Sequence, residues 1–424
     1  MTPPKITTDA GMRKLTICRM CDSQKLFKFL DLGKTALADR FMREPQLVRP
    51  EYEYPLEVMM CEDCGLAQLS VVVDPQLLYC EEYPYESSTT KAGARHWTEF
   101  AETTARMLGL GANDLVVDAG SNVGVLLSKF RDQGARVLGV DPADNIAQIA
   151  RDNGIDTISA FFNLETAKKV VASHGNATVL TGTNVFAHIH DLAGFAAAAD
   201  HLLNQKGVVI VEMPYFGELL QNLEYDTIYH EHLSYVALSP AAKYFERYGF
   251  EIFEVQRRDI HGGSFRLFAR RKGSSDKPAA DIVGQLLEME KREGLQDPAR
   301  LKAFAEAVAT NREELRGLIN QLHADGKRVA AVSAPAKGMT LLNYCGLGRD
   351  LLDFVTEKSK LKIGRYTPGT RIQVVSDDVL IRERPDYALL LAWNFSEEIM
   401  ANLKQYSDAG GKFIIPIPNP RIVG

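Results

Sequence analysis

The stretch Tyr225–Tyr235 gathers two histidines, three tyrosines and two acids within eleven residues. Neither a helix face nor strand alternation requires such a concentration of polar groups, so we interpret it as a site rather than a polar surface. A helical conformation would place Tyr229 and His232 on one face. An extended conformation would instead pair Tyr229 with Glu231, and His230 with His232. The two histidines also suggest a metal site, but no third ligand at helical spacing supports that alternative.

Four of the six cysteines occur as two Cys-x-x-Cys pairs, Cys18 with Cys21 and Cys61 with Cys64. Two such tight turns can offer four thiolates to one ion in tetrahedral geometry, which favours zinc. Because four sulfurs close the coordination shell, we expect a structural zinc rather than a catalytic one. An iron–sulfur cluster and four unrelated buried cysteines are the weaker alternatives. The segment between the pairs is long enough for a small sheet or hairpins.

A second motif runs from Asp118 to Gly124, where an apolar run ends in an acid and a glycine-bearing turn precedes an amphipathic segment. This pattern predicts a strand, a tight loop and a helix, with a ligand lying over the loop. Gly120 and Gly124 allow the backbone to approach a ligand closely. The next apolar run ends at Asp141, which is placed to accept hydrogen bonds from ribose hydroxyls. A dinucleotide fingerprint would also require glycine at positions 122 and 125, where this chain has Asn and Val.

These motifs need a scaffold, and alternating apolar and helical segments supply one. Helical spacing of apolar residues predicts a helix over residues 91–108. Repeated strand–helix units from residue 115 to residue 212 predict a mostly parallel sheet with helices on both sides. Charged helices are predicted between residues 278 and 323. The remaining residues repeat the α/β pattern, with strands predicted at 328–332, 352–356, 387–392 and 412–417 and a helix from Thr340.

Length and composition limit the class of protein. A chain of 424 residues exceeds one ordinary core, so two or three domains are expected. Apolar content of 46% and charged content of 25% are typical of a globular protein. The net charge of −6 argues against a general nucleic-acid-binding surface. Because we find neither a long apolar run nor a secretory signal, we expect no membrane association and a cytoplasmic location.

The loop from Asp118 to Gly124 resembles the first motif of class I S-adenosylmethionine-dependent methyltransferases. The chain as a whole resembles the nucleotide-sugar C-methyltransferases, the family that methylates C3 of a nucleoside-diphosphate 4-keto-deoxysugar in branched-deoxysugar biosynthesis. The resemblance covers nearly the whole chain, and the order of the motifs carries it. The matching segments are both cysteine pairs, Tyr83–Tyr85, Asp118–Gly124, Asn184–His188, Tyr229–His232, His261–Ser264, Ala334–Gly338 and Leu342–Tyr344.

The resemblance implies an α/β protein of three domains. These are a four-cysteine zinc-binding domain over residues 1–75, a class I methyltransferase Rossmann-like domain over 76–275, and linker helices with a C-terminal Rossmann-like domain over 276–424 that binds the nucleotide sugar. The expected cofactors are S-adenosylmethionine and structural Zn²⁺, and the expected partner is a nucleoside-diphosphate 4-keto sugar. A monomer is compatible with the sequence. The predicted cofactor-binding residues are Asp118, Gly120, Ser121, Asn122, Gly124, Asp141 and Phe161.

The chemistry that the resemblance implies requires a base. A 4-keto group acidifies the neighbouring C3–H, and its removal needs a group whose pKa lies near the working pH. Histidine meets this need without perturbation, so we predict His232 as general base and Tyr229 as assisting or alternative base. The other predicted catalytic residues are Glu231, which would hold a hydroxyl, and His188, which would grip the sugar or its oxyanion. The predicted substrate-binding residues are Tyr83, His188, Glu231, Lys337 and Arg365, of which the last two would face the diphosphate.

Three other interpretations stay open at this point. The chain could be an O- or N-methyltransferase, which needs no proton abstraction from carbon. It could be a nucleotide-sugar oxidoreductase, although the residues at positions 122 and 125 disfavour this. It could also be a zinc-domain adaptor in which the acids and histidines are incidental. The lysines that precede Arg365 suit a diphosphate too, but a solvated basic loop is the commoner explanation for Lys358, Lys360 and Lys362.

Overall fold

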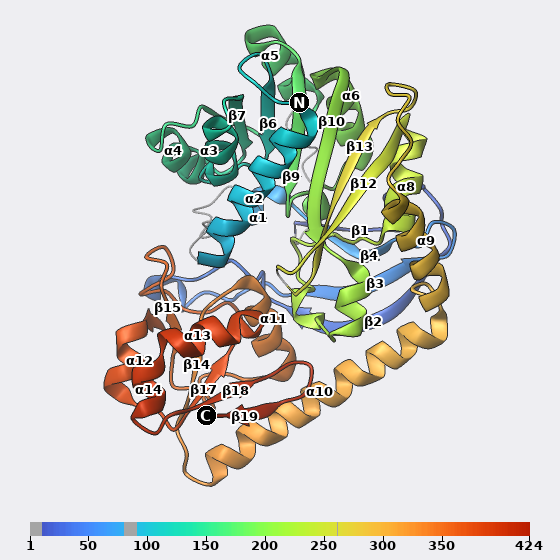
Figure 1. Ribbon diagram of the computed structural model, residues 1–424. Helices are drawn as coiled ribbons and strands as arrows, with labels where there is room; N and C mark the ends of the chain where they lie inside the picture. The colour runs from blue at the N-terminus through green and yellow to red at the C-terminus, as the bar shows by residue number, and fades with distance from the viewer. Residues whose placement is uncertain (1–10, 80–90, 261) are drawn as a thin grey trace.

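The computed structural model describes residues 11–79, 91–260 and 262–424 of the chain. Figure 1 shows three sheets that meet near the middle of the molecule. The first part of the chain, in blue, lies between the central sheet above it and the C-terminal sheet below it. Helix α10 (Pro298–Ala324) crosses from the right-hand side to the foot of the C-terminal part.

The N-terminal part is a small antiparallel sheet that also takes a strand from the middle of the chain. Its strand order is β11-β4-β3-β2. The strands are β2 (Leu26–Thr35), β3 (Tyr54–Cys61), β4 (Ala67–Leu69) and β11 (Ser234–Tyr235). The remaining elements are the paired strands β1 (Met12–Lys14) and β5 (Val71–Val73), with η1 (Glu44–Gln46) and α1 (Pro75–Tyr79). Because β11 begins two residues after His232, this sheet fixes the end of the Tyr225–Tyr235 stretch.

The central sheet has seven strands in the order β12-β13-β10-β9-β6-β7-β8. Strands β8, β7, β6, β9 and β10 are parallel, and β13 is antiparallel between β10 and β12. The order of added strands reverses between β6 and β9, so the carboxyl ends of these strands form a topological switch point, where ligands bind. The strands are β6 (Leu115–Ala119), β7 (Arg136–Asp141), β8 (Thr157–Ser159), β9 (Ala177–Thr183), β10 (Leu203–Pro214), β12 (Phe250–Arg258) and β13 (Ser264–Arg271).

Helices pack against this sheet, and every residue of β6 is buried, as expected for a parallel strand covered on both faces. The predicted helix over 91–108 is α2 (Lys91–Leu108), whose buried Trp97 and Phe100 pack with Phe130 of α3 (Val125–Asp132). The further helices are α4 (Asp144–Asp152), α5 (Leu164–His174), η2 (Phe186–His188), α6 (Leu192–Leu202), α7 (Phe216–Gln221), η3 (Tyr225–Thr227) and α8 (Leu238–Arg247).

The C-terminal sheet has six strands in the order β16-β15-β14-β17-β18-β19. All are parallel except β19, and the order again reverses, between β14 and β17, which creates a second switch point. The strands are β14 (Val329–Val332), β15 (Val355–Glu357), β16 (Val374–Ser376), β17 (Tyr387–Leu390), β18 (Lys412–Ile415) and β19 (Arg421–Val423). The helices are α9 (Asp281–Glu293), α10, α11 (Ala336–Cys345), α12 (Asp377–Glu383), η4 (Trp393–Phe395), α13 (Ser396–Asn402) and α14 (Lys404–Asp408).

Some elements differ from the sequence prediction. Helix α11 begins at Ala336 rather than at Thr340, because Pro335 acts as its N-cap residue and the helix follows at once. The sequence analysis assigned no strand to the segments of β12, β13, β16 and β19. Strands β12 and β13 are antiparallel neighbours joined without a helix, so they fall outside the strand–helix repeat on which the prediction was based.

Helix α10 ties the C-terminal part to the Tyr225–Tyr235 stretch through one buried side chain. Asn311 donates hydrogen bonds to the carbonyl oxygens of Pro416 (2.9 Å) and Pro418 (2.8 Å). The Tyr225 hydroxyl donates to Asn311 Oδ1 over 2.7 Å. A buried polar group that is satisfied on all sides holds the surrounding segments in a single arrangement. The start of the stretch is therefore fixed by α10, as its end is fixed by β11.

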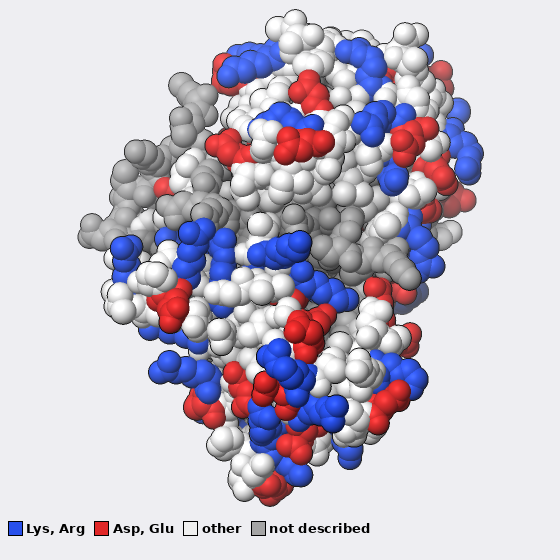
Figure 2. All heavy atoms as spheres, turned by 90° about the vertical axis from the view of Figure 1, so that its left-hand side faces the viewer, with Lys and Arg blue, Asp and Glu red and all other residues white. Residues whose placement is uncertain are grey.

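The surface and the core fit a globular protein. One cluster of buried apolar side chains extends from the zinc-domain strands through the central sheet to the C-terminal sheet. On the face shown in Figure 2, acidic and basic side chains are interspersed over the upper and lower parts. Among the described residues, no helix combines the length and apolar character needed to cross a bilayer.

Candidate functional site

A single cavity of about 1570 Å³ lies where the carboxyl ends of both parallel sheets face each other. Its wall includes the loop after β6, the loop after β14 and the turn with Cys18 and Arg19, which belong to three different parts of the chain. Tyr229 and His232 line it between these parts. Ligand sites in open α/β sheets occur at switch points, and here two switch points open into one space.

The loop after β6 has the backbone geometry that the glycine spacing predicted. Gly120 has φ +72°, and a Cβ there would fall 2.3 Å from Val185 Cγ2. Gly124 has φ +81° and is the N-cap residue of α3. Asn122 adopts φ +49°, a left-handed conformation that Asn tolerates better than most residues. The loop therefore stays thin where it borders the cavity, and the buried Ser121 Oγ there has no protein partner.

Two acids flank this loop. Asp141 Oδ2 accepts from the Asn122 N–H and its Oδ1 accepts from the Ala143 N–H, each over 2.9 Å. Asp118 accepts from the Thr181 hydroxyl over 2.7 Å. Burial raises the pKa of Asp118 to about 7, and it raises the pKa of Asp141 as well. Both acids line the cavity, so a bound cation or hydroxyl there would relieve part of their desolvation.

Most of the predicted cofactor residues lie on the cavity wall. Gly124 is not among the lining residues, because it packs against the Ile155 side chain on the side of the loop away from the cavity. The sequence analysis names Asn184 only as part of a matching segment and gives neither Thr181 nor Asn184 a site role. The buried Asn184 Oδ1 also has no partner. The predicted residues that do line the cavity are Asp118, Gly120, Ser121, Asn122, Asp141 and Phe161.

Tyr229 and His232 form a hydrogen-bonded pair at i, i+3. The Tyr229 hydroxyl lies 2.8 Å from His232 Nε2, and His232 Nδ1 lies 2.7 Å from the Thr227 carbonyl oxygen. A carbonyl oxygen can only accept, so Nδ1 carries the proton in the neutral ring. Nε2 is then the basic nitrogen and accepts from the tyrosine. The stretch is an irregular turn after η3, yet it produces the pairing expected of a helix.

His188 stands beside this pair. Its ring centroid is 4.9 Å from that of His232, and its Nδ1 lies 3.2 Å from the Tyr79 hydroxyl. Nε2 of His188 is buried and has no hydrogen-bond partner. Burial and the neighbouring His232 hold the pKa of His188 well below its usual value, so the ring is neutral. If Tyr79 donates to Nδ1, the free Nε2 carries a proton and can donate it to a ligand oxygen.

The other two residues of the Tyr229–His232 motif are buried and are not among the residues that line the cavity. His230 Nε2 lies 3.2 Å from the carbonyl oxygens of both Tyr54 and Pro55, so it anchors the stretch to the N-terminal part. His230 and His232 therefore do not form a metal pair. Glu231 is buried but is not among the lining residues, and its predicted contact with a substrate hydroxyl stays a prediction.

The C-terminal wall holds Lys337, in the first turn of α11. Its Nζ lies 3.8 Å from Asp226 Oδ2 and 4.4 Å from the centre of the Trp393 ring. Trp393 Nε1 donates to the same carboxylate over 2.7 Å. Lys337, which was predicted to bind the diphosphate, is therefore already paired with Asp226. This pairing was not predicted from the sequence. Arg365 is not among the residues that line the cavity, and Tyr83 lies outside the described residues.

At the second switch point, as at the first, an acid at the end of a strand accepts hydrogen bonds from loop N–H groups. Glu357, at the end of β15, accepts from the Ala334 N–H over 3.0 Å and from the Ser359 N–H over 3.1 Å. Asp141 makes the corresponding pair of bonds at the end of β7. Ser333 also matches Gly120, because each follows the first strand of its sheet with a left-handed φ, +70° for Ser333. Both loops are therefore shaped to receive a ligand, although no glycine-rich motif marks the second one.

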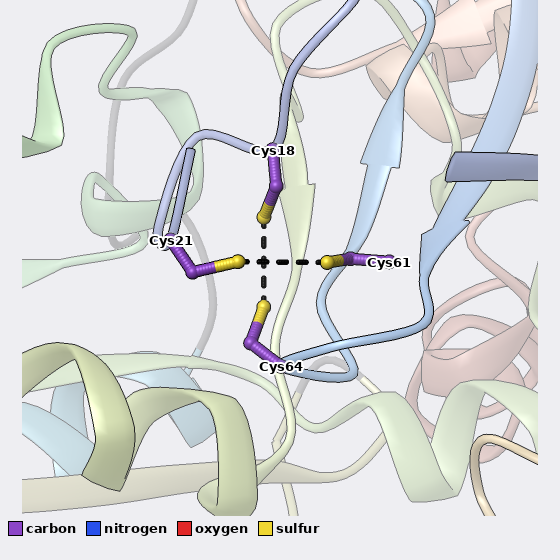
Figure 3. Close-up of side chains that lie close together, drawn as sticks. All are labelled: Cys18, Cys21, Cys61 and Cys64. Atoms are coloured by element: carbon purple, nitrogen blue, oxygen red, sulfur yellow. Dashed lines mark hydrogen bonds between the residues drawn. The ribbon is translucent and has the colours of Figure 1, made fainter. Parts of the chain in front are cut away.

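The four predicted metal ligands come together as a tetrahedral set (Figure 3). All four sulfurs lie within 4.8 Å of one another, with Cys18 and Cys64 at 3.5 Å and Cys21 and Cys61 at 3.6 Å. Zn–S bonds of about 2.3 Å place tetrahedral sulfurs roughly 3.8 Å apart, so the cluster fits zinc. The described residues contain no other such group. With its shell closed by thiolates, this zinc is structural.

We predict that Cys64→Ser abolishes zinc binding and, with it, enzymatic activity, because the zinc ligand Cys18 and its neighbour Arg19 form part of the cavity wall. Metal content by mass spectrometry and the melting temperature measure the effect. Cys345→Ser is the matched control, since Cys345 is buried against the Tyr225 hydroxyl and should leave zinc content unchanged. A Cys64→Ser protein with full zinc content would contradict this assignment.

Asp118 should make cofactor binding depend on pH. A ligand ammonium near Asp118 favours its ionised form, and in the free protein that form is a minority below about pH 7. Affinity for S-adenosylmethionine should therefore rise as pH rises, by about eightfold between pH 6 and 7.5 for a pKa near 7. Isothermal titration calorimetry measures it, and Asp118→Asn should flatten the profile. An equally steep profile in that variant would show that another group is responsible.

Three family models match successive parts of the chain. Residues 259–418 match the family described as "C-methyltransferase C-terminal domain", residues 94–255 match "Methyltransferase domain" and residues 18–79 match "Putative zinc binding domain". Among solved structures, a methyltransferase from Clostridium acetobutylicum is 14% identical with a TM-score of 0.34, over 42% of this chain and 92% of that one. Magnesium protoporphyrin IX methyltransferase from Synechocystis is 16% identical with a TM-score of 0.32, over 46% and 89%.

A curated relative matches this chain over nearly its whole length. C-methyltransferase NovU from Streptomyces niveus is 37% identical over 412 residues, which is 97% of this chain and 98% of the relative. This chain belongs to the S-adenosylmethionine-dependent C-methyltransferases.

Proposed function

We propose that the protein methylates C3 of a nucleoside-diphosphate 4-keto-deoxysugar through an enolate. The observation that carries the proposal is the Tyr229–His232 pair in the wall of a cavity with two ligand-binding ends. A C-methyltransferase must create a carbon nucleophile, and a ketone makes the neighbouring carbon acidic enough for a side-chain base. An O- or N-methyltransferase needs no proton abstraction from carbon.

In the proposed reaction, Tyr229 and His232 act together as the base. The Tyr229 oxygen takes the C3 proton while its own proton passes to His232 Nε2, so the pair gains one proton and the sugar becomes an enolate. The alternative within the same geometry is direct removal of the C3 proton by Nε2. The Thr227 carbonyl stabilises the resulting imidazolium through Nδ1–H.

His188 is placed to stabilise the enolate oxygen. The neutral His188 ring lies beside the base, and its buried Nε2 has no protein partner. Nε2–H is therefore available to donate a hydrogen bond to a ligand oxygen. Because His188 stays neutral, it does not repel the imidazolium that forms at His232. A donor of this kind contributes roughly 3–4 kcal/mol when charge develops on the oxygen.

The cavity must also hold both substrates in line. S-adenosylmethionine, when bound over the loop after β6, supplies the methyl group as an electrophile. The chain orients the sugar carbon toward it by fixing the Tyr225–Tyr235 stretch at both ends, through Asn311 and through β11. Orientation of this kind accounts for a large share of the rate in displacement reactions. The predicted roles of Lys337, Arg365, Glu231 and Tyr83 toward the sugar nucleotide remain proposals.

The test is methylation of a panel of thymidine, guanosine and cytidine diphosphate 4-keto-6-deoxysugars, followed by mass spectrometry of the product. Tyr229→Phe and His232→Gln should each lower kcat by about 10²–10⁴ with little change in KM, because they remove the base rather than binding contacts. Tyr248→Phe is the control, since Tyr248 lines the same cavity outside the catalytic group. No methylation of any ketosugar, or full activity of Tyr229→Phe and His232→Gln, would refute the proposal.

A further inference from the structure

Tyr79, the last residue of α1, lies in the cavity wall beside His188, although the two residues are 109 positions apart in the chain. Its hydroxyl lies 3.2 Å from His188 Nδ1, and the two rings stack with centroids 6.1 Å apart and an interplanar angle of 20°. The Phe161 ring meets Tyr79 edge-on, with centroids 6.5 Å apart. Tyr79 was not predicted from the sequence as a site residue.

The Tyr79 hydroxyl can determine which nitrogen of the His188 ring carries the proton. A neutral imidazole has one N–H group and one acceptor nitrogen. A phenol hydroxyl is a good hydrogen-bond donor and a poor acceptor, so the favourable arrangement has Tyr79 donating to Nδ1. The ring proton then lies on Nε2, which is the nitrogen that is buried without a hydrogen-bond partner.

Both side chains have the protonation state that this hydrogen bond requires. Burial, together with the nearby Glu231 and Asp39 carboxylates, holds the pKa of Tyr79 well above its usual value, so the phenol keeps its proton. Burial and the neighbouring His232 hold the pKa of His188 well below its usual value, so the imidazole is uncharged. Near neutral pH the contact is therefore an O–H···N bond between two neutral groups.

The tautomer decides what His188 presents to the acceptor. With the proton on Nε2, the ring donates a hydrogen bond to the oxygen on which negative charge develops. With the proton on Nδ1, the ring would present a lone pair to that oxygen and repel it. A hydrogen bond accepted at Nδ1 also polarises the ring, which makes Nε2–H a stronger donor.

The two histidines of the cavity wall thus have partners of opposite kind. The Thr227 carbonyl can only accept, so it places the His232 proton on Nδ1 and leaves Nε2 basic. The Tyr79 hydroxyl donates, so it places the His188 proton on Nε2 and leaves that nitrogen a donor. The ring centroids of His188 and His232 lie 4.9 Å apart. Neighbouring imidazoles can therefore serve as base and as hydrogen-bond donor in the same step.

We infer that Tyr79 is a positioning residue for the enolisation step, because it fixes His188 as the hydrogen-bond donor to the enolate oxygen. This inference rests on the proposed function. It gives α1, which follows the N-terminal strands, a part in the reaction through the tautomer of a residue on the central domain.

The first measurement is the tautomer of His188, read from the ring nitrogen-15 chemical shifts of the full-length zinc protein with saturating S-adenosylhomocysteine. The His188 signals are identified by their absence in His188→Gln. We expect a protonated Nε2 and an unprotonated Nδ1 in the wild-type protein, and a shift of the Nδ1 signal in Tyr79→Phe, where the donor is lost. A wild-type ring protonated at Nδ1, or unchanged His188 signals in Tyr79→Phe, would overturn the inference.

The second measurement is the exchange of the C3 proton of a nucleoside-diphosphate 4-keto-6-deoxysugar in deuterium oxide. Tyr79→Phe should slow exchange about tenfold with little change in KM, since it weakens a donor to the enolate without removing it. In a His188→Gln background the same substitution should slow the residual exchange less than twofold, because Tyr79 acts through His188. Tyr406→Phe is the control, since it removes a buried tyrosine hydrogen bond, to the Pro385 carbonyl, outside the cavity. It should lower the melting temperature without slowing exchange.

The double-substitution comparison separates this role from a structural one. Equal slowing by Tyr79→Phe in the wild-type and His188→Gln backgrounds would overturn the inference, as would exchange at the wild-type rate in Tyr79→Phe. The proposed function stands in both cases, because the wild-type enzyme still exchanges and methylates the sugar. No exchange by the wild-type protein with any ketosugar would instead remove the proposed function, and this inference with it.

Discussion

The hydrogen bond from His232 Nδ1–H to the Thr227 carbonyl is the interaction on which the proposed chemistry depends. It fixes the tautomer, so the basic nitrogen faces Tyr229 and the cavity. Without it, the imidazole could turn or protonate at the wrong nitrogen, and the tyrosine would lose its proton acceptor. Thr227 ends the short 3-10 helix η3, and His232 lies in the irregular turn that follows, which has no helix or sheet of its own to hold it in place.

Contacts from all three parts of the chain therefore hold that turn in one conformation. Tyr225 is held by Asn311 of α10, and the Thr340 hydroxyl of α11 donates to the Ile228 carbonyl over 3.0 Å. His230 is held by backbone carbonyls of β3. Strand β11 then closes the segment against β4. The N-terminal sheet and helices α10 and α11 of the C-terminal part together hold this turn in place.

Much of the fold and of the site could be predicted from the sequence where a short local pattern determines the conformation. The cysteine pairs, the glycine turn after β6 and the Tyr229–His232 spacing each constrain a short segment, and each is present as expected. Residues whose role depends on distant partners were not predictable in this way. The placement of Tyr79 beside His188, and of Asp226 against Lys337, follows from contacts between segments far apart in the chain.

The same reasoning explains why the second switch point was only partly foreseen. Its strands were mostly predicted, but the loop after β14 uses Ser333 in a left-handed conformation where a glycine would have signalled the turn. Glu357 holds that loop as Asp141 holds the first one, and nothing in the spacing of a single glutamate reveals this. The sequence alone could not show that these two loops line the same cavity, because they lie more than two hundred residues apart in the chain.

The most direct measurement is proton exchange at the carbon to be methylated. The protein is incubated in deuterium oxide with a nucleoside-diphosphate 4-keto-6-deoxysugar and with S-adenosylhomocysteine in the donor half of the cavity, and the sugar is followed by proton NMR. The account predicts loss of the C3 proton signal with the wild-type protein and none above background with Tyr229→Phe or His232→Gln. Retention of the C3 proton with a sugar that the enzyme does methylate would contradict the proposed enolate.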